Sequence, residues 1–208
     1  MTVATLGEAF DRSLQARRMQ AVIEQVCAAR ARSVLDAGCG DGDLLVRLAE
    51  LPDLTRIVGL DPDPAKILAA RAALGLESPW ACPRISLEPV SLFEYARAPE
   101  RFDVCTLVEV IEHVEPGRLG ALERALFGQI RPRVVVVTTP NRDYNARLGM
   151  PPGSFRHPDH RFEWGRARFG EWARRVAGEH GLQVEVSGIG DADPVLGAPT
   201  QMAVFIRA

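Results

Sequence analysis

SVLDAGCGDG, at residues 33–42, combines a short apolar run with three closely spaced glycines. The segment that follows, DLLVRLAEL (43–51), has the spacing of a helix, and RIVGLD (56–61) then repeats the apolar run and ends on a carboxylate. A strand, a glycine turn, a helix and a second strand are the opening unit of a parallel, doubly wound sheet. We therefore expect an α/β fold.

The alternation of strands and helices continues to the end of the chain. Helical spacing precedes the glycine turn, in an amino-terminal segment over residues 1–30, and the stretch 140–165 is irregular. The last two apolar runs have no helix between them, which predicts an antiparallel pair. The sequence thus predicts a doubly wound, Rossmann-like sheet with a final antiparallel strand. Further helices are expected over 64–74, 119–130 and 167–180, and further strands within 85–93, 102–110, 134–139, 182–190 and 201–208.

Length and composition point to one globular domain over residues 1–208, with 47% apolar and 25% charged residues. No apolar run reaches the roughly 18 residues that span a bilayer, and the amino terminus lacks the apolar core of a signal peptide. We expect a cytoplasmic protein without a membrane partner. The net charge of −2 argues against coating long nucleic acid, but it allows binding of a single RNA end.

The glycine turn has the features of a nucleoside site. Gly38 and Gly40 allow a ligand to approach the main chain, and Asp61 is placed to accept the hydroxyls of a ribose. A dinucleotide is the competing ligand, but Asp36 and its acidic neighbours would repel a pyrophosphate. They suit the ammonium and sulfonium of S-adenosylmethionine. The DxGxGxG motif resembles the cofactor loop of the seven-strand methyltransferases, and by the same resemblance Ser91 contacts the adenine end of the cofactor.

A second cluster combines carboxylates with imidazoles. Glu109, Glu112 and His113 follow the fourth strand and share one face if they form the first turn of a helix. His157 or His160, in the irregular stretch after the fifth strand, supplies a fourth ligand. Carboxylates and imidazoles without a thiolate suit Mn²⁺, Mg²⁺, Co²⁺ or Fe²⁺. The alternative is an acidic pair that merely favours the helix dipole.

Four motifs together resemble one enzyme family. EVIEHV (109–114), TTPN (138–141), RHPDHRFEW (156–164) and APTQMAVF (198–205) are similar, in order and spacing, to the small-RNA 3′-terminal 2′-O-methyltransferases and their bacterial relatives in RNA repair. The resemblance implies the seven-strand methyltransferase sheet and a divalent metal, Mn²⁺ by preference with Mg²⁺ or Co²⁺ possible, which holds both hydroxyls of the last ribose. The implied metal ligands and catalytic residues are Glu109, Glu112, His113 and His160.

The resulting expectation is metal-assisted, S-adenosylmethionine-dependent 2′-O-methylation of the 3′-terminal ribose of RNA. Arg156, Arg18 and Asn141 are expected to contact the RNA, with 140–165 as the substrate and metal loop. RNA-repair or small-RNA-processing proteins are the implied partners. Two alternatives are a metal-dependent O-methyltransferase of a small diol and a non-catalytic module that binds RNA ends; the intact metal set argues against the second.

Overall fold

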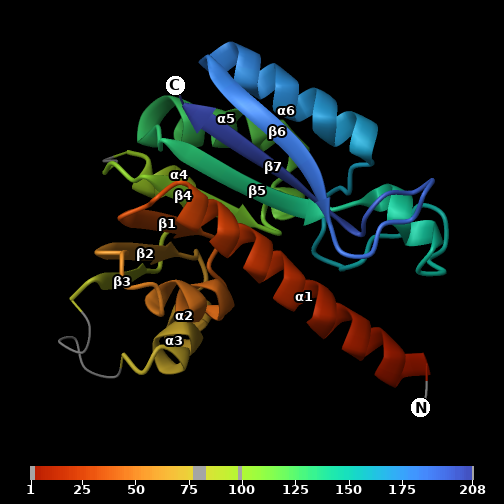
Figure 1. The fold of residues 1–208 in the computed structure, drawn as a ribbon, viewed down its shortest axis with the longest axis horizontal. Helices are drawn as coiled ribbons and strands as arrows, with labels where there is room; N and C mark the ends of the chain where they lie inside the picture. The colour runs from red at the N-terminus through yellow and green to blue at the C-terminus, as the bar shows by residue number, and fades with distance from the viewer. Residues whose placement is uncertain (1–2, 77–82, 98–99, 208) are drawn as a thin grey trace.

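The computed structural model describes residues 3–76, 83–97 and 100–207. Its centre is a seven-stranded sheet in the order β3-β2-β1-β4-β5-β7-β6 (Figure 1). Strands β1 to β5 are parallel, and β7 runs antiparallel between β5 and β6, so the predicted fold class is confirmed. The strands are β1 (Ser33–Ala37), β2 (Arg56–Leu60), β3 (Ile85–Glu88), β4 (Val104–Val108), β5 (Val134–Pro140), β6 (Leu182–Ile189) and β7 (Thr200–Arg207).

Helices cover both faces of the sheet, because successive side chains of each buried strand point to opposite sides. Val34 of β1 packs in one apolar cluster, and Leu35, its neighbour, packs in the other. The first cluster is covered by α1 (Val3–Ala28), α2 (Asp43–Ala49) and α3 (Pro64–Ala73), and the second by α4 (Leu92–Tyr95), α5 (Leu119–Glu123), the π-helical turns η3 (Arg124–Ile130) and α6 (Arg166–His180).

Two local predictions need correction. The single helix expected over 119–130 changes to π-helical turns at Arg124. The helical turn expected after β4 is a 3₁₀ turn, η1 (Ile111–His113), and Glu109 precedes it with a left-handed backbone at φ 55°. Because Glu109 lies outside the turn, helical spacing does not place it on the face that Glu112 and His113 share. A second 3₁₀ segment, η4 (Arg142–Ala146), lies in the irregular stretch.

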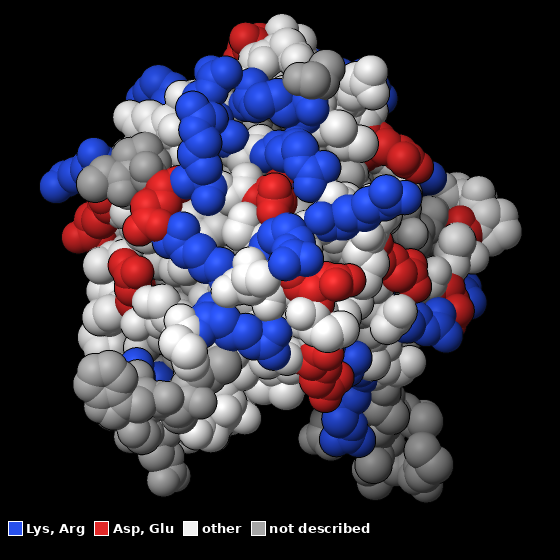
Figure 2. Space-filling view, turned by 60° about the vertical axis from the view of Figure 1, so that its left-hand side comes forward, with Lys and Arg blue, Asp and Glu red and all other residues white. Residues whose placement is uncertain are grey.

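The parallel strands position the site, since the loops after β1, β2, β4 and β5 all open at the same edge of the sheet. The register pairs Asp36 with Thr106 and Val108 with Thr138, which brings the glycine turn, η1 and the end of β5 together. Basic and acidic side chains are interspersed on the face shown in Figure 2, in keeping with the small net charge. Among the described residues, no helix has the length and hydropathy needed to cross a bilayer.

Candidate active site

A tight backbone turn opens the site at the end of β1. Gly38 and Gly42 have left-handed backbones, with φ 81° and 91°, which L-residues with side chains rarely adopt. A Cβ atom at Gly38 would lie 2.6 Å from Val110, and one at Gly42 would lie 2.9 Å from Ala70. Both glycines are therefore required by packing as well as by conformation.

The turn forms one wall of a cleft of about 710 Å³, a size typical of small-molecule sites. The loop after β4 also lines the cleft, through Glu109 and His113. The structure brings together all five residues that the sequence analysis assigned to the cofactor, since Asp36, Gly38, Gly40, Asp61 and Ser91 all line this cleft.

Asp36 is the most deeply buried acid of the cleft. Its side chain accepts a hydrogen bond of 2.7 Å from the Thr106 hydroxyl on β4. Burial raises the pKa of Asp36 to about 7, and the nearby charge of Asp61 acts in the same direction, against the Thr106 hydrogen bond. A cationic ligand in the cleft would favour its charged form.

Asp61 and Ser91 also order the backbone of the cleft. The Asp61 carboxylate accepts hydrogen bonds from the Gly40 and Asp63 amides, at 3.1 and 2.9 Å, so it links β2 to the glycine turn. Ser91 caps α4, and its hydroxyl lies 2.7 Å from the Glu94 carboxylate in a reciprocal capping box.

A second group of polar side chains lies beside the cleft. Glu112, His113 and His160 offer ligand atoms that lie within 4.8 Å of one another. Glu112 is completely buried; its Oε2 accepts a hydrogen bond of 2.9 Å from Thr139, while its buried Oε1 has no hydrogen-bond partner. Burial and the charge of Glu109 raise the pKa of Glu112 well above its usual range. A bound cation would satisfy this carboxylate.

Three imidazoles meet at this group. The rings of His113 and His160 lie edge to face with centroids 4.8 Å apart, and His157 lies 6.0 and 5.7 Å from them. Burial and the two neighbouring imidazoles lower the pKa of His113, which favours the neutral form that binds metals. Of the two histidines considered as a fourth ligand, His160 is in the three-residue group and His157 is outside it.

The structure does not bring Glu109 into that group. Its carboxylate instead accepts a hydrogen bond of 2.9 Å from Thr138 and forms an ion pair of 3.1 Å with Arg18 of α1. The left-handed backbone of Glu109 directs the side chain towards α1 and the cleft. The arrangement therefore contains three of the four expected ligands, with Glu109 nearby but paired elsewhere.

All three residues expected to contact RNA have partners within the protein, and that of Arg18 is Glu109. Asn141 is fully buried, and its amide donates to the carbonyls of Leu196 and Ala198, at 2.9 and 2.8 Å. All three guanidinium nitrogens of Arg156 donate to the protein, to Asn145 Oδ1 and to the carbonyls of Pro199 and Asn141. These donors hold the irregular stretch against the segment that precedes β7, and contact of Asn141 or Arg156 with RNA stays a prediction. Arg18 lines the cleft.

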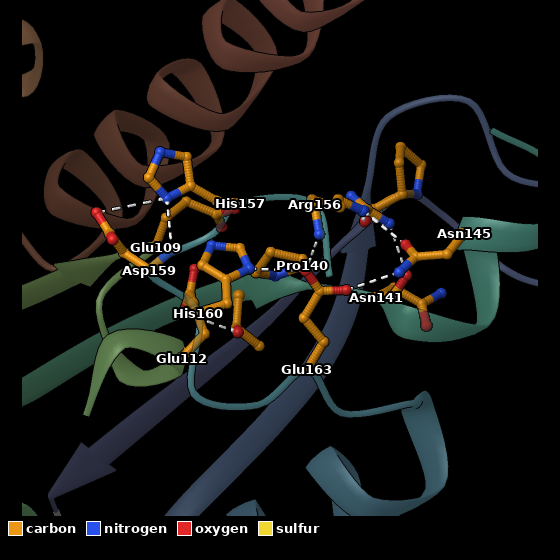
Figure 3. A network of polar contacts seen from close by, with 12 residues as sticks. Glu109, Glu112, Pro140, Asn141, Asn145, Arg156, His157, Asp159, His160 and Glu163 are labelled. Atoms are coloured by element: carbon orange, nitrogen blue, oxygen red, sulfur yellow. Dashed lines mark hydrogen bonds and ion pairs between the residues drawn. The ribbon is translucent and has the colours of Figure 1, made fainter. Parts of the chain in front are cut away.

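The sequence analysis missed the residues that hold the cluster in place (Figure 3). Thr138 and Thr139, at the end of β5, bind the two glutamates, and Glu163 binds His160. Although burial acts to raise the pKa of Glu163, hydrogen bonds from His160, Arg156 and Asn145 hold it below its usual range. The two adjacent threonines of the TTPN motif were the sequence feature that could have indicated hydrogen bonds to the glutamates.

Comparisons with known proteins identify methyltransferases that this chain resembles. A family model described as a methyltransferase domain matches residues 35–132. The small RNA 2′-O-methyltransferase of Xenopus tropicalis is 32% identical over 209 residues, which cover 96% of this chain and 56% of that protein. This chain thus spans about half the length of that relative.

Solved structures extend the similarity to the whole domain. The methyltransferase domain of a bacterial Hen1, CtHen1-CN, is 36% identical with a TM-score of 0.82, over 93% of this chain and 100% of that one. The small RNA methyltransferase HEN1 is 30% identical with a TM-score of 0.82, over 93% of this chain and 26% of that one.

Proposed function

This chain belongs to the Hen1 family of small RNA 2′-O-methyltransferases, and we propose that it transfers a methyl group from S-adenosylmethionine to the 2′-hydroxyl of the 3′-terminal ribose of RNA. The observation that carries the proposal is the position of His113. This residue lines the cleft beside the glycine turn and also belongs to the three-residue group with Glu112 and His160. A substrate held at the group would therefore lie next to the methyl donor.

In this proposal, each cleft residue contacts a different part of the cofactor. Asp61 accepts the ribose hydroxyls, Ser91 lies at the adenine end, and the backbone at Gly38 and Gly40 packs against the methionine portion. Asp36 attracts the ammonium group. Burial disfavours the charged form of this carboxylate, and a nearby cation would stabilise it. The cleft brings three further carboxylates, Asp41, Asp43 and Asp63, to the same ligand, which disfavours a phosphate-bearing cofactor.

The residues present fit a divalent cation. A buried carboxylate oxygen without a partner, Glu112 Oε1, is costly unless a cation or donor satisfies it. Ring nitrogens of His113 and His160 lie within 4.8 Å of each other and of a Glu112 carboxylate oxygen. Carboxylate with imidazole suits Mn²⁺, with Mg²⁺ or Co²⁺ as alternatives. When bound, such an ion would lower the pKa of the ribose hydroxyl and orient it for attack on the methyl group. Glu112, His113 and His160 would hold it.

The direct test is methyl transfer from labelled S-adenosylmethionine to a short RNA oligonucleotide in the presence of Mn²⁺. We expect one methyl group per molecule, and nuclease digestion with mass spectrometry should locate it on the 2′-oxygen of the last nucleoside. A small catechol-like diol serves as the competing substrate. Labelling of the diol with no labelling of RNA would contradict the proposal.

Cofactor affinity should depend on pH through Asp36. Its pKa of about 7 means that most of the carboxylate is neutral at pH 6 and charged at pH 8. If the ammonium needs the charged form, S-adenosylhomocysteine should bind about tenfold more weakly at pH 6 than at pH 8. The raised pKa also means that this group makes the ligand-free fold less stable as pH rises from about 4 towards 7.

Calorimetric titration at both pH values checks this prediction, with Asp36→Asn as the matched variant. The amide cannot ionise, so the variant should bind weakly at both pH values and lose most of the difference between them. The same pH dependence in the wild type and in Asp36→Asn would show that another group is responsible.

A further inference from the structure

We propose that Glu163, supported by Asn145 and Arg156, is a positioning residue that fixes the ring orientation and tautomer of His160. The proposal rests on the proposed function, because it assigns these residues to the metal group of that site. It also accounts for the many hydrogen bonds among Asn145, Arg156 and Glu163 in the irregular stretch (Figure 3).

The first support is the burial and complete pairing of Glu163. Its side chain is fully shielded from solvent. Oε1 lies 2.7 Å from His160 Nδ1 and accepts a hydrogen bond of 2.6 Å from the Arg156 amide. Oε2 accepts a hydrogen bond of 2.6 Å from Asn145 Nδ2. Both oxygens are therefore committed to named donors.

The pairing decides which nitrogen of His160 carries the proton. A carboxylate only accepts hydrogen bonds, so Nδ1 must be the protonated nitrogen of the neutral ring. Nε2 is then left with a free lone pair, and it is the nitrogen available to the group that His160 forms with Glu112 and His113. A carboxylate on the far side of a ligand histidine fixes its tautomer and makes it a better ligand.

The donors and acceptors around Glu163 are fixed by a chain of hydrogen bonds that starts at Arg156, so only an acceptor at position 163 completes the chain. Arg156 Nε donates to Asn145 Oδ1 at 2.7 Å, and Asn145 Nδ2 in turn donates to Glu163. Since a guanidinium only donates, the Asn145 amide cannot be reversed. A neutral amide at position 163 would therefore place two donors face to face, either at Asn145 or at the Arg156 main-chain amide and His160.

The arrangement also ties the histidine to the rest of the site. The Arg156 side chain bonds the carbonyls of Asn141 and Pro199, which follow β5 and precede β7. The Arg161 amide donates to the Glu112 carbonyl at 2.7 Å, which joins the same loop to η1. His160 is thus held relative to Glu112 from both sides.

The first experiment uses the wild-type protein without metal, cofactor or RNA. Long-range ¹H–¹⁵N NMR of the histidine rings distinguishes the two tautomers. We expect His160 to be protonated at Nδ1 and unprotonated at Nε2. The opposite tautomer would overturn the proposal, while leaving the proposed methyltransferase function intact.

The second experiment exchanges the carboxylate and the amide. Glu163→Gln keeps the size of the side chain, and it should weaken Mn²⁺ binding by about 10- to 100-fold and mix the His160 tautomers. Adding Asn145→Asp restores an acceptor for both the Arg156 guanidinium and the new amide, so the double variant should regain the Nδ1-protonated ring and most of the Mn²⁺ affinity.

Affinity for S-adenosylhomocysteine is the control and should stay close to wild type in both variants, because Glu163 does not line the cleft. A merely structural role predicts that Glu163→Gln leaves the tautomer of His160 unchanged. Wild-type Mn²⁺ affinity in Glu163→Gln, or equal loss in the single and double variants, would refute the positioning role.

Discussion

Replacing Glu112 by Gln should reduce methyl transfer by at least about a hundredfold while leaving cofactor binding nearly unchanged. Glu112 is the only carboxylate among the three residues that meet within 4.8 Å in the described part of the chain, and its Oε1 has no partner of its own. Loss of that oxygen should misplace the reacting hydroxyl, and a displacement of about 1 Å costs on the order of a hundredfold in rate. Single-turnover methylation of RNA measures the effect.

Glutamine is chosen because Glu112→Gln should not unfold the protein. The amide side chain in Glu112→Gln has nearly the same volume, and its carbonyl can still accept the Thr139 hydrogen bond that Glu112 accepts at 2.9 Å. Glu115→Ala is the matched control, because Glu115 is an exposed acid three residues further along that pairs only with Arg161 among the described ion pairs. Full activity of Glu112→Gln, or of wild type in excess EDTA, would exclude a role for the metal.

The strands of the parallel sheet were predictable because buried strands leave a strong local pattern. The apolar runs at 33–38, 56–61 and 134–139 correspond to β1, β2 and β5 to within one or two residues. Each run ends at glycine, proline or a carboxylate, and β-branched residues dominate β5. The final antiparallel pair was predictable for the same reason, since no helical segment separates its two runs.

The backbone around the site was harder to predict. Glu109, Glu112 and His113 have helical spacing, and spacing alone cannot distinguish an α-helix from a single 3₁₀ turn. Glu109 has a left-handed backbone, and its amide donates a hydrogen bond of 3.1 Å to the Thr138 carbonyl at the end of the neighbouring strand β5. A contact between residues so far apart in the chain leaves no local pattern.

The same limit applies to the loop residues whose partners within the protein were not predicted. A loop arginine is usually exposed, so Arg156 was expected to reach a phosphate, whereas its donors satisfy carbonyls near β5 and β7. Glu163 and Asn145 were missed because their roles depend on one another across the loop. The sequence identifies the carboxylates and imidazoles proposed as ligands, whereas the residues that support them are recognised only in the folded chain.

An RNA with a 3′-terminal phosphate should be methylated at least about a hundredfold more slowly than the same RNA with a 2′,3′-diol, a loss comparable to that caused by a displacement of about 1 Å at the reacting atoms. The proposed site requires both hydroxyls of the last ribose, and a phosphate replaces one of them with a bulky anion. The Asp159 carboxylate also lines the cleft beside His113, and it would repel such a group.

The comparison should use one oligonucleotide sequence prepared with four different 3′-terminal riboses: diol, 3′-phosphate, 3′-deoxy and 2′-deoxy. Each version is measured in single-turnover reactions with Mn²⁺. The 2′-deoxy end lacks the acceptor and should be inert. The 3′-deoxy end keeps the acceptor but loses one orienting contact, so its rate should lie between those of the diol and the phosphate. Treating the phosphorylated RNA with a phosphatase should restore the full rate, which shows that the end alone is responsible. Equal methylation of the diol and phosphate ends would mean that the site recognises the 2′-hydroxyl without its neighbour, and the diol requirement would have to be abandoned.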